Sequence, residues 1–595
     1  MTKPKIIWFR RDLRLSDQAA VAAASDSPVI PVYILDDETP KHRIMGGASR
    51  WWLHRSLEEL EACLQSLGSR LILRQGPAAE HLAEIVKSSG ADEIHALHHY
   101  EPWWINAERM LEKSLGDEAR LILHDGNYLL PPGTVTTGAG TPYKIYTPFW
   151  KALRQHMPPG EAAPAPESLD APDNWPDSDA LDDWGLLPTK PNWAAAFGDH
   201  WQPGSAGAED NLEDFADKAA DYDEGRNLPS EELVSRLSPH LHFGEISPAT
   251  VWNRLAGQGS KVETYLKELV WRDYAQNVID QFPQYGGESY REKMRALPWR
   301  DLGDDAVKAD FGAWCQGRTG YPIVDAGMRE LWATGWMHNR VRMIAASFLI
   351  KHLLIDWREG EKWFWDTLVD ADYASNSVNW QWVSGTGVDS NMFVRIMAPL
   401  TQSEKFDAGD YIRQWVPELA EIDDPYIHDP EDHGCRPADY PAKIIGHKEA
   451  RQRAPVRRAG HFDTYIQDLS CTDYQENFAL SPVLPAASAR RLPGPLSTKA
   501  RRFCLPTAMP RCCRPPGKNW AATHCRWTWS RRRTGNDLPP CTRGPMLWSI
   551  MRASPALKRA WGRMTRKMPR SKTGALSTGS IWTGPFSAVA MRSGR

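Results

Sequence analysis

The chain has 595 residues, more than one hydrophobic core normally serves, so two or three domains are expected. Its formal net charge of −4 conceals a split along the sequence. After Asn477 there are 23 lysines and arginines against one acidic residue, a net +22, and the rest of the chain holds 48 against 74, a net −26. A chain whose first 477 residues are so acidic does not coat nucleic acid through its overall charge. Nucleic acid would have to bind at a local basic rim.

Targeting signals and cysteine usage indicate the compartment. Met1–Pro4 leads directly into a strand-like segment, which argues against a signal peptide, and no apolar run approaches the ~20 residues of a membrane span. Only Cys63, Cys315 and Cys435 precede residue 470, and their wide separation argues against a disulfide framework or an iron–sulfur cluster. We therefore expect a cytoplasmic protein without a metal site.

Short apolar runs alternate with helical patterns over residues 1–130. The runs predicted as buried strands are Lys5–Arg10, Val29–Leu35, Arg70–Arg74, Glu93–His98 and Ala119–His124, and the predicted helices are Ser49–Leu67 and Pro77–Ser88. This alternation predicts an α/β domain with a parallel, Rossmann-like sheet. The first strand is followed by RRDLR rather than by a G-x-G-x-x-G turn, so the usual dinucleotide fingerprint is absent.

The composition changes twice further along the chain. Residues 131–207 are rich in Pro, Asp and Ala and are predicted to be a surface connection between domains. Residues 208–470 have helical periodicity and a high apolar content, which predicts a large all-α domain. Within it, Ser247-Pro248 indicates a helix start, with Ser as N-cap and Pro in the first turn.

The tail, residues 471–595, has neither helical nor strand periodicity and holds six of the nine cysteines. Two interpretations stay open: a basic arm that binds nucleic acid, or a segment that is out of frame or has no fixed structure. We favour the second. Cys512, Cys513, His524 and Cys525 do not indicate a zinc site, because adjacent cysteines are not the usual ligand spacing.

The segment Gly320–Trp382 interleaves tryptophans with polar residues at helical spacing. Asp372, Asn376 and Trp380 lie four residues apart, so a helix would place them on one stripe, with Asp370 just before it. A carboxylate, a carboxamide and an indole suit the edge and face of a buried flat heterocycle. The alternative, a polar helix face in contact with solvent, is disfavoured by the neighbouring tryptophans.

A second cluster occupies the sequence WMHNRVRM. Asn339 and Arg342 are three residues apart and share a helix face, with Arg340 and Met343 beside them. An arginine in so apolar a helix requires a partner. Two partners stay open for Arg342, a diphosphate or a carboxylate such as that of Asp370.

A third cluster has the spacing of one helix. Tyr265, Glu268, Trp271 and Arg272 fall on neighbouring ridges. An acid beside an indole can accept from the edge of a flipped base while the ring stacks on it. The alternative is an exposed Glu–Arg pair with a core tryptophan.

A fourth cluster follows Tyr222 and Arg226. The sequence VSRLS at residues 234–238 leads into a predicted helix, and the hydroxyls of Ser235 and Ser238 with free backbone N–H groups suit a phosphate. A simple helix N-cap is the alternative.

These motifs closely resemble those of the DNA photolyase/cryptochrome family over residues 5–455, most of all bacterial class I-like photolyases for cyclobutane pyrimidine dimers. The resemblance implies that the helical domain binds reduced FAD non-covalently. It assigns cofactor contacts to Tyr222, Val234, Ser235, Arg236, Leu237, Ser238, Tyr265, Arg272, Asn339, Arg342, Asp370, Asp372, Asn376 and Trp380. Asn376 falls where photolyases keep Asn beside flavin N5, which favours a reduced flavin competent for repair. Val234 replaces the Thr of the family's T-S-x-L-S loop, so one hydroxyl donor is lost.

The resemblance also implies roles in catalysis and substrate binding. The catalytic set is Glu268, Asn376, Trp299, Trp357 and Trp380, in which the three tryptophans match an electron relay from the surface to the flavin. The substrate set is Arg226, Glu268, Trp271, Arg340, Met343 and Trp382. Glu268 would hydrogen-bond the dimer, Trp271 would stack on it, and both arginines would meet DNA phosphates. Glutamate at 268 argues against the (6-4) photolyases, which usually carry Gln there.

One motif departs from the folate-using bacterial members. Where these have an Asn-Glu pair soon after Tyr-Glu, this chain has Trp103 and Trp104 directly after Tyr100-Glu101-Pro102. The indoles could stack on another antenna chromophore or fill space, and a folate pterin or a deazaflavin both stay open.

The expected function is light-driven repair of pyrimidine dimers in DNA, by electron transfer from excited reduced FAD to a flipped-out dimer. Two alternatives stay open, a bacterial cryptochrome that senses blue light and a DASH-type photolyase acting on single strands. We expect a monomer with no obligate protein partner.

Overall fold

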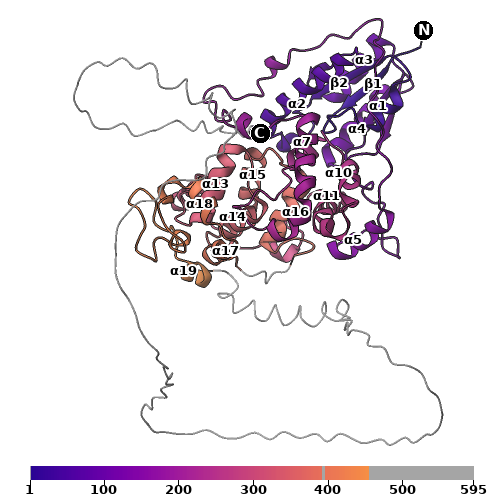
Figure 1. Cartoon of the computed structure of the whole chain (residues 1–595). Coiled ribbons are helices and arrows are strands. Elements are labelled where there is room, and N and C mark those ends of the chain that lie inside the picture. Colours follow the sequence, from indigo (N-terminus) through magenta and orange to yellow (C-terminus); the bar gives the residue numbers. More distant parts are fainter. Residues whose placement is uncertain (1, 391–395, 454–595) are drawn as a thin grey trace, which may run out of the picture. The chain divides into compact units, whose positions relative to one another are not determined.

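The computed structural model describes residues 2–390 and 396–453, and the statements below concern these residues (Figure 1). The predicted tail at 471–595, with Cys512, Cys513, His524 and Cys525, lies outside them, as does the end of the expected helical domain. Within the described ranges, no helix has the length and apolarity to cross a membrane, and no group of three or more His, Cys, Asp or Glu side chains is placed to hold a metal ion.

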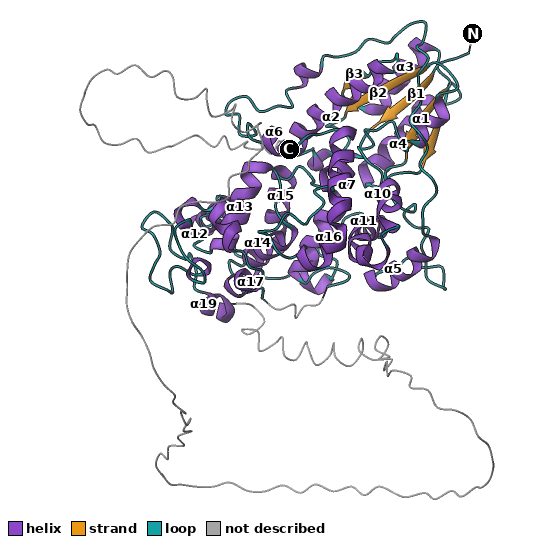
Figure 2. Ribbon diagram, in the orientation of Figure 1, coloured by secondary structure: helices purple, strands orange, loops and turns teal. Residues whose placement is uncertain are grey.

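Five parallel strands form one sheet in the order β3-β2-β1-β4-β5 (Figure 2). They are β1 (Lys5–Phe9), β2 (Val29–Leu35), β3 (Ile72–Gln75), β4 (Glu93–Leu97) and β5 (Arg120–His124). Ile6 of the central strand lies beside Ile30 on one side and Ile94 on the other. The inner strands are buried on both faces, which explains their continuous apolar runs. The predicted α/β class with a parallel sheet is confirmed.

Helices cover both faces of this sheet. They are α1 (Ala19–Ala24), α2 (Gly47–Ser66), α3 (Ala78–Ser89) and α4 (Pro102–Leu115). Phe9 shares a core with Trp52 of α2, whereas its neighbour Trp8 shares one with Leu82 of α3, as alternation along a strand requires. The third strand begins at Ile72 rather than at Arg70 as predicted, because its ladder with β2 starts there.

The connection between the two parts carries α5 (Tyr146–Leu153) and α6 (Phe197–His200). It was predicted to lie on the surface, and this is only partly so. Trp184 and Trp201 are buried in the core of the sheet domain, and Phe149 and Trp150 in that of the helical part. A Pro- and Asp-rich composition therefore concealed a few apolar anchors.

The rest of the described chain is helical, as predicted. Its helices are α7 (Ser205–Lys218), α8 (Tyr222–Gly225), α9 (Ser238–Phe243), α10 (Pro248–Ala256), α11 (Glu263–Gln281), α12 (Asp305–Cys315), α13 (Pro322–Thr334), α14 (Asn339–Lys351), α15 (Trp357–Thr367), α16 (Tyr373–Ser384), α17 (Pro399–Lys405), α18 (Gly409–Trp415) and α19 (His447–Arg453). The predicted start of α10 is confirmed: the Ser247 hydroxyl accepts from the backbone N–H of Thr250 at 2.9 Å, and Pro248 is the first helical residue.

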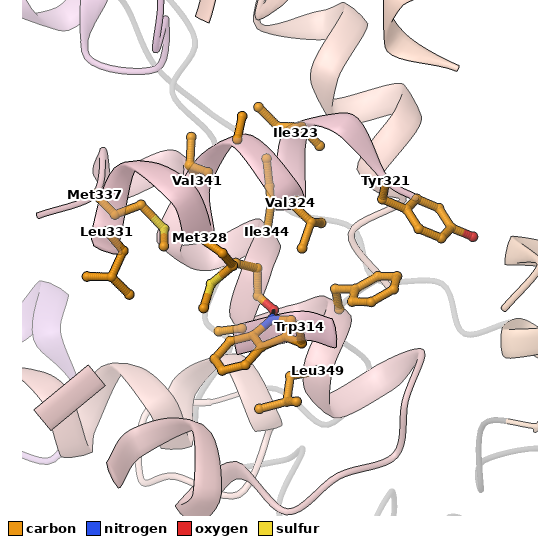
Figure 3. Close-up of a cluster of buried hydrophobic side chains, with 14 of the residues drawn as sticks. Trp314, Tyr321, Ile323, Val324, Met328, Leu331, Met337, Val341, Ile344 and Leu349 are labelled. Atoms are coloured by element: carbon orange, nitrogen blue, oxygen red, sulfur yellow. Dashed lines mark hydrogen bonds between the residues drawn. The ribbon is translucent and has the colours of Figure 1, made fainter. Parts of the chain in front are cut away.

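Helix α16 lies between two apolar cores. Its Trp380 belongs to the core formed around α12–α15, and its Val378 to the core formed around α10 and α11. Figure 3 shows part of the first core, where Trp314 of α12 lies with Met328 of α13 and Leu349 of α14. Because α16 is packed from both sides, polar side chains on it are held in fixed positions.

Candidate functional site

A bidentate ion pair joins α14 to the turn between α15 and α16. Arg342 donates from Nη1 and Nη2 to the two carboxylate oxygens of Asp370 at 3.0 and 2.8 Å, and from Nε to the carbonyl of Met337 at 2.7 Å. The Asp370 side chain is only 3% exposed. Of the two partners left open for Arg342, the carboxylate is present. Asn339, at the start of α14, is exposed and can meet a ligand.

The carboxamide of Asn376 is held in one orientation. Its Nδ2 donates to the main-chain oxygen of Glu361 at 3.1 Å and to Oε1 of the same residue at 3.0 Å. Both partner atoms only accept, so the nitrogen must face them. No donor in the described part of the chain reaches Oδ1 of Asn376, which is left for a ligand.

Two residues of this site, Glu361 and Arg43, were not predicted from the sequence. Arg43 donates to the two carboxylate oxygens of Glu361 at 2.7 and 2.9 Å. Arg43 lies 318 residues away in sequence, and nothing near it indicates a site. Glu361 had a weak signal: it shares a buried helix face with Trp357 and Phe364, four residues before it and three after. A carboxylate on an apolar stripe indicates a buried polar partner.

Asp372 is placed differently from the prediction. It precedes α16 as the N-cap and accepts from the backbone N–H of Ser375 at 2.7 Å. Its carboxylate lies 3.5 Å from Arg11 and 4.0 Å from His242. Burial raises the pKa of Asp372, but Arg11 and His242 outweigh it and bring this pKa below its usual value. Asp372 thus faces the junction with the sheet domain, and its contact with the cofactor stays a prediction.

Two arginines and a carboxylate converge beside α11. Glu268 forms an ion pair with Arg226 at 2.6 Å. The guanidinium of Arg226 lies 5.5 Å from the centre of the Tyr222 ring. Arg340 of α14 donates to the side chain of Asn227 at 3.1 Å. Burial lowers the pKa of Arg340, and the positive charge of Arg226 lowers it further. Such a rim suits phosphate groups around one acceptor.

The three apolar side chains predicted to line the lesion are all partly buried. Trp271 packs against Tyr146 with ring centres 4.7 Å apart. Met343 Sδ lies 3.6 Å from a guanidinium nitrogen of Arg340, and Trp382 borders the α12–α15 core. Each therefore has part of its surface available for contact.

Arg272 contacts the main chain of two distant segments, and its cofactor contact stays a prediction. It donates to the main-chain carbonyls of Asn127 and, at 3.1 Å, of Leu241. Its guanidinium lies 4.6 Å from the centre of the Tyr128 ring. Arg272 thereby ties α11 to the chain leaving the sheet domain, with two of its five N–H donors used there.

The loop at residues 234–238 keeps its hydroxyl groups close together. The Tyr265 hydroxyl donates to Ser235 Oγ at 3.0 Å, and the same Oγ accepts from the backbone N–H of Leu237 at 3.3 Å. Ser238 is exposed and accepts from Trp336 Nε1 at 3.3 Å.

Arg236, in the same loop, is held between two indoles. Its guanidinium lies 4.7 Å from the ring of Trp201 and 4.8 Å from that of Trp336. Its φ of +53° is the left-handed conformation, which is strained for a side chain of this kind. Its buried Nε has no hydrogen-bond partner among the described residues. A stacked, unsatisfied guanidinium beside serine hydroxyls fits a diphosphate.

The predicted relay tryptophans belong to one core. Trp380 lies 5.1 Å from Phe364 and 6.4 Å from Trp314, measured between ring centres. Trp357 is fully buried in this core, and Trp299 is half-buried at its edge. Two of the three indoles are therefore buried and the third is partly exposed, and an electron relay through them stays a prediction.

A small cavity of about 60 Å³ opens at the carboxyl end of β2, where ligands bind in open parallel sheets. Its wall includes Arg11, Arg43, Trp103, Trp104, His242 and Trp365. Trp103 packs edge-on against Tyr373 at 4.9 Å, and Trp104 against Trp8 at 6.4 Å. Both indoles therefore border open space.

Comparison with known proteins gives the class. Residues 5–168 match the family described as DNA photolyase, and residues 265–459 match the FAD binding domain of DNA photolyase. The deoxyribodipyrimidine photo-lyase of Agrobacterium fabrum is 46% identical over 475 residues, covering 76% of this chain and 97% of that protein. Cryptochrome-2 of Arabidopsis thaliana is 36% identical over 73% of each chain.

A solved structure agrees. The crystal structure of a class III photolyase from Agrobacterium tumefaciens is 45% identical with a TM-score of 0.72, over 78% of this chain and 98% of that one. The chain therefore belongs to the DNA photolyase/cryptochrome family and carries its FAD-binding domain. The predicted class I-like type finds no support in this likeness.

Proposed function

We propose that this protein is a photolyase that repairs cyclobutane pyrimidine dimers in DNA under blue light. The observation that carries the proposal is the orientation of Asn376, whose oxygen is left free by Glu361. That oxygen can accept from a protonated flavin N5, the form present when FAD is reduced. Bound reduced FAD would supply the electron that opens the cyclobutane ring and recover it afterwards.

The chain's own residues bind and orient the reactants. Arg236 and Ser235 would hold the diphosphate, and Asn376 the ring edge. Glu268 would accept from the N–H groups of a flipped dimer while Trp271 stacks against it. The Arg226–Glu268 pair must open or share its acceptor when the dimer enters, which frees the arginine for a DNA phosphate.

We propose that a second, light-harvesting chromophore stacks at the mouth of the cavity beside β2, since the cavity itself, at about 60 Å³, is too small to enclose one. Trp103 and Trp104 offer stacking faces, and Arg11 and Arg43 lie in the same wall. A folate pterin and a deazaflavin both carry a flat ring and anionic groups that such a wall can bind. Mass spectrometry of the small molecules released from purified protein distinguishes them.

The proposed activity has a direct test. Purified protein with chemically reduced flavin is mixed with double- or single-stranded DNA containing dimers, and the lesions are counted after blue light or darkness. We expect loss of dimers from double strands in the light only. Repair of single strands alone would indicate a DASH-type enzyme, and no repair of either would favour a cryptochrome.

Trp357→Phe tests the relay. Phe keeps the packing but is much harder to oxidise, so we expect photoreduction of oxidised flavin to be lost. Repair by chemically reduced enzyme should stay at the wild-type rate. The control is Trp332→Phe, since Trp332 is half exposed and stacks on Trp363 outside the relay. If reduced Trp357→Phe also fails to repair, Trp357 is needed for structure instead.

A further inference from the structure

An arginine of the sheet domain reaches into the helical domain. Arg43 ends a short 3₁₀ helix after β2, η1 (Lys41–Arg43), and its side chain is only 10% exposed. Its Nη1 donates to both carboxylate oxygens of Glu361, and its Nη2 donates to the carbonyl of Gly286 at 2.6 Å. The guanidinium lies 5.0 Å from the centre of the Tyr373 ring. The hydrogen bonds that the Arg43 side chain makes to described residues thus all go to the helical domain.

Glu361 is the link between Arg43 and Asn376. Its carboxylate is 1% exposed, so Asn376 and Arg43 replace the water that an ionised group would otherwise bind. Burial raises the pKa of Glu361 above its usual value, and Arg43 and the hydrogen bond from Asn376 offset only part of that rise. Lys362 also lowers the pKa of Glu361, but more weakly. Its side chain is exposed and pairs with Glu359.

The main-chain oxygen of Glu361 holds Nδ2 of Asn376, and the charge of the Glu361 carboxylate decides whether the second contact favours the same orientation. While the carboxylate is ionised it only accepts, so Nδ2 turns to it and Oδ1 turns away. A protonated Glu361 could donate to Oδ1 of a turned carboxamide, which would lose its bond to the main-chain oxygen of Glu361 and present Nδ2 to the ligand. An oxidised flavin N5 accepts and a reduced, protonated N5 donates, so the two orientations favour opposite redox states.

We propose that Arg43 is a positioning residue that, through Glu361, holds the Asn376 oxygen toward flavin N5 and so favours the reduced flavin. The inference rests on the proposed function in one respect, the location of Asn376 beside N5. It adds that the redox state of the flavin depends on a residue of the other domain. The same side chain forms part of the cavity wall beside β2.

The test is a redox titration of the flavin-loaded, full-length protein. Arg43→Gln removes the charge, and we expect the ratio of reduced to oxidised flavin at a fixed potential to fall at least tenfold, about 30 mV for a two-electron couple. A carboxylic acid C=O band of Glu361 should appear in the infrared difference spectrum. Arg43→Lys should restore most of the ratio, since it restores the charge.

A second variant covers the case in which Arg43→Gln does not fold. Glu361→Gln is isosteric and has a side chain that can donate as well as accept, so only the main-chain oxygen still favours the present orientation of Asn376 and we expect a loss of similar size. Combining it with Arg43→Gln should give no further change. A wild-type ratio in either single variant would overturn the proposal.

The matched control is Arg50→Gln. Arg50 lies on the next helix, α2, and pairs with Asp37 at 2.6 Å, without a hydrogen bond to Glu361. The ratio of reduced to oxidised flavin in the Arg50→Gln protein should equal that of the wild type. A fall as large as that of Arg43→Gln would overturn the specific role of Arg43. The titration is independent of repair. A wild-type protein that binds no FAD contradicts the proposed function, whereas one that binds FAD without responding to Arg43 contradicts this inference alone.

Discussion

Glu268→Gln is expected to weaken the binding of dimer-containing DNA about ten- to a hundredfold, because a hydrogen bond to a charged acceptor contributes about 1.5–3 kcal/mol. Gln keeps the shape of the side chain but lacks the charge that a dimer's N–H groups would meet. The change also leaves Arg226 without its 2.6 Å partner. We therefore expect undamaged DNA to bind as well as before or better, with a salt slope steeper by about one.

Binding is measured by fluorescence anisotropy at several salt concentrations, and flavin content by absorbance. Glu263→Gln is the control, since Glu263 lies on the same helix and pairs with Lys267 at 2.9 Å in the same way. It should leave both affinities unchanged. Equal weakening for damaged and undamaged DNA would mean that Glu268 supports DNA binding in general and does not recognise the dimer. A loss of flavin would mean that Glu268 supports cofactor binding.

The fold was largely predictable because its signals are local. Strands of a parallel sheet are buried on both faces, so β1 and β2 are visible as unbroken apolar runs. The ends of β3 were less visible, since they are set by pairing with β2. The connection at 131–207 was misjudged because a few buried tryptophans, such as Trp184, anchor a segment of polar composition.

The candidate site was predictable only along single helices. Spacing placed Glu268 and Trp271 on one helix and Asn376 near Trp380 on another. It did not show that Asp372 caps its helix and faces Arg11, because a cap depends on where the helix starts. Contacts between distant segments leave no periodic signal, and for that reason Arg43 was missed.

The second large effect is expected from Arg342→Ala, which leaves the carboxylate of Asp370 buried without its cation. Breaking a buried ion pair on one side destabilises a protein by about 3–5 kcal/mol. Asp370 is 3% exposed and accepts two bonds from Arg342, so little water can compensate it. Urea unfolding should show the loss, and Arg413→Ala should change stability by about 1 kcal/mol or less, since its partners Asp410 and Asp424 are at least half exposed.

The double variant Arg342→Ala/Asp370→Ala decides between the two partners that the sequence left open for Arg342. Removing both charges ends the penalty of an unpaired carboxylate, so we expect at least half of the lost stability to return. If Asp370 is the only partner that matters, flavin content should return with stability. If the guanidinium also meets the cofactor, the double variant will be stable but poor in flavin. The geometry favours the first outcome, because Nη1, Nη2 and Nε of Arg342 each already donate to Asp370 or to the carbonyl of Met337.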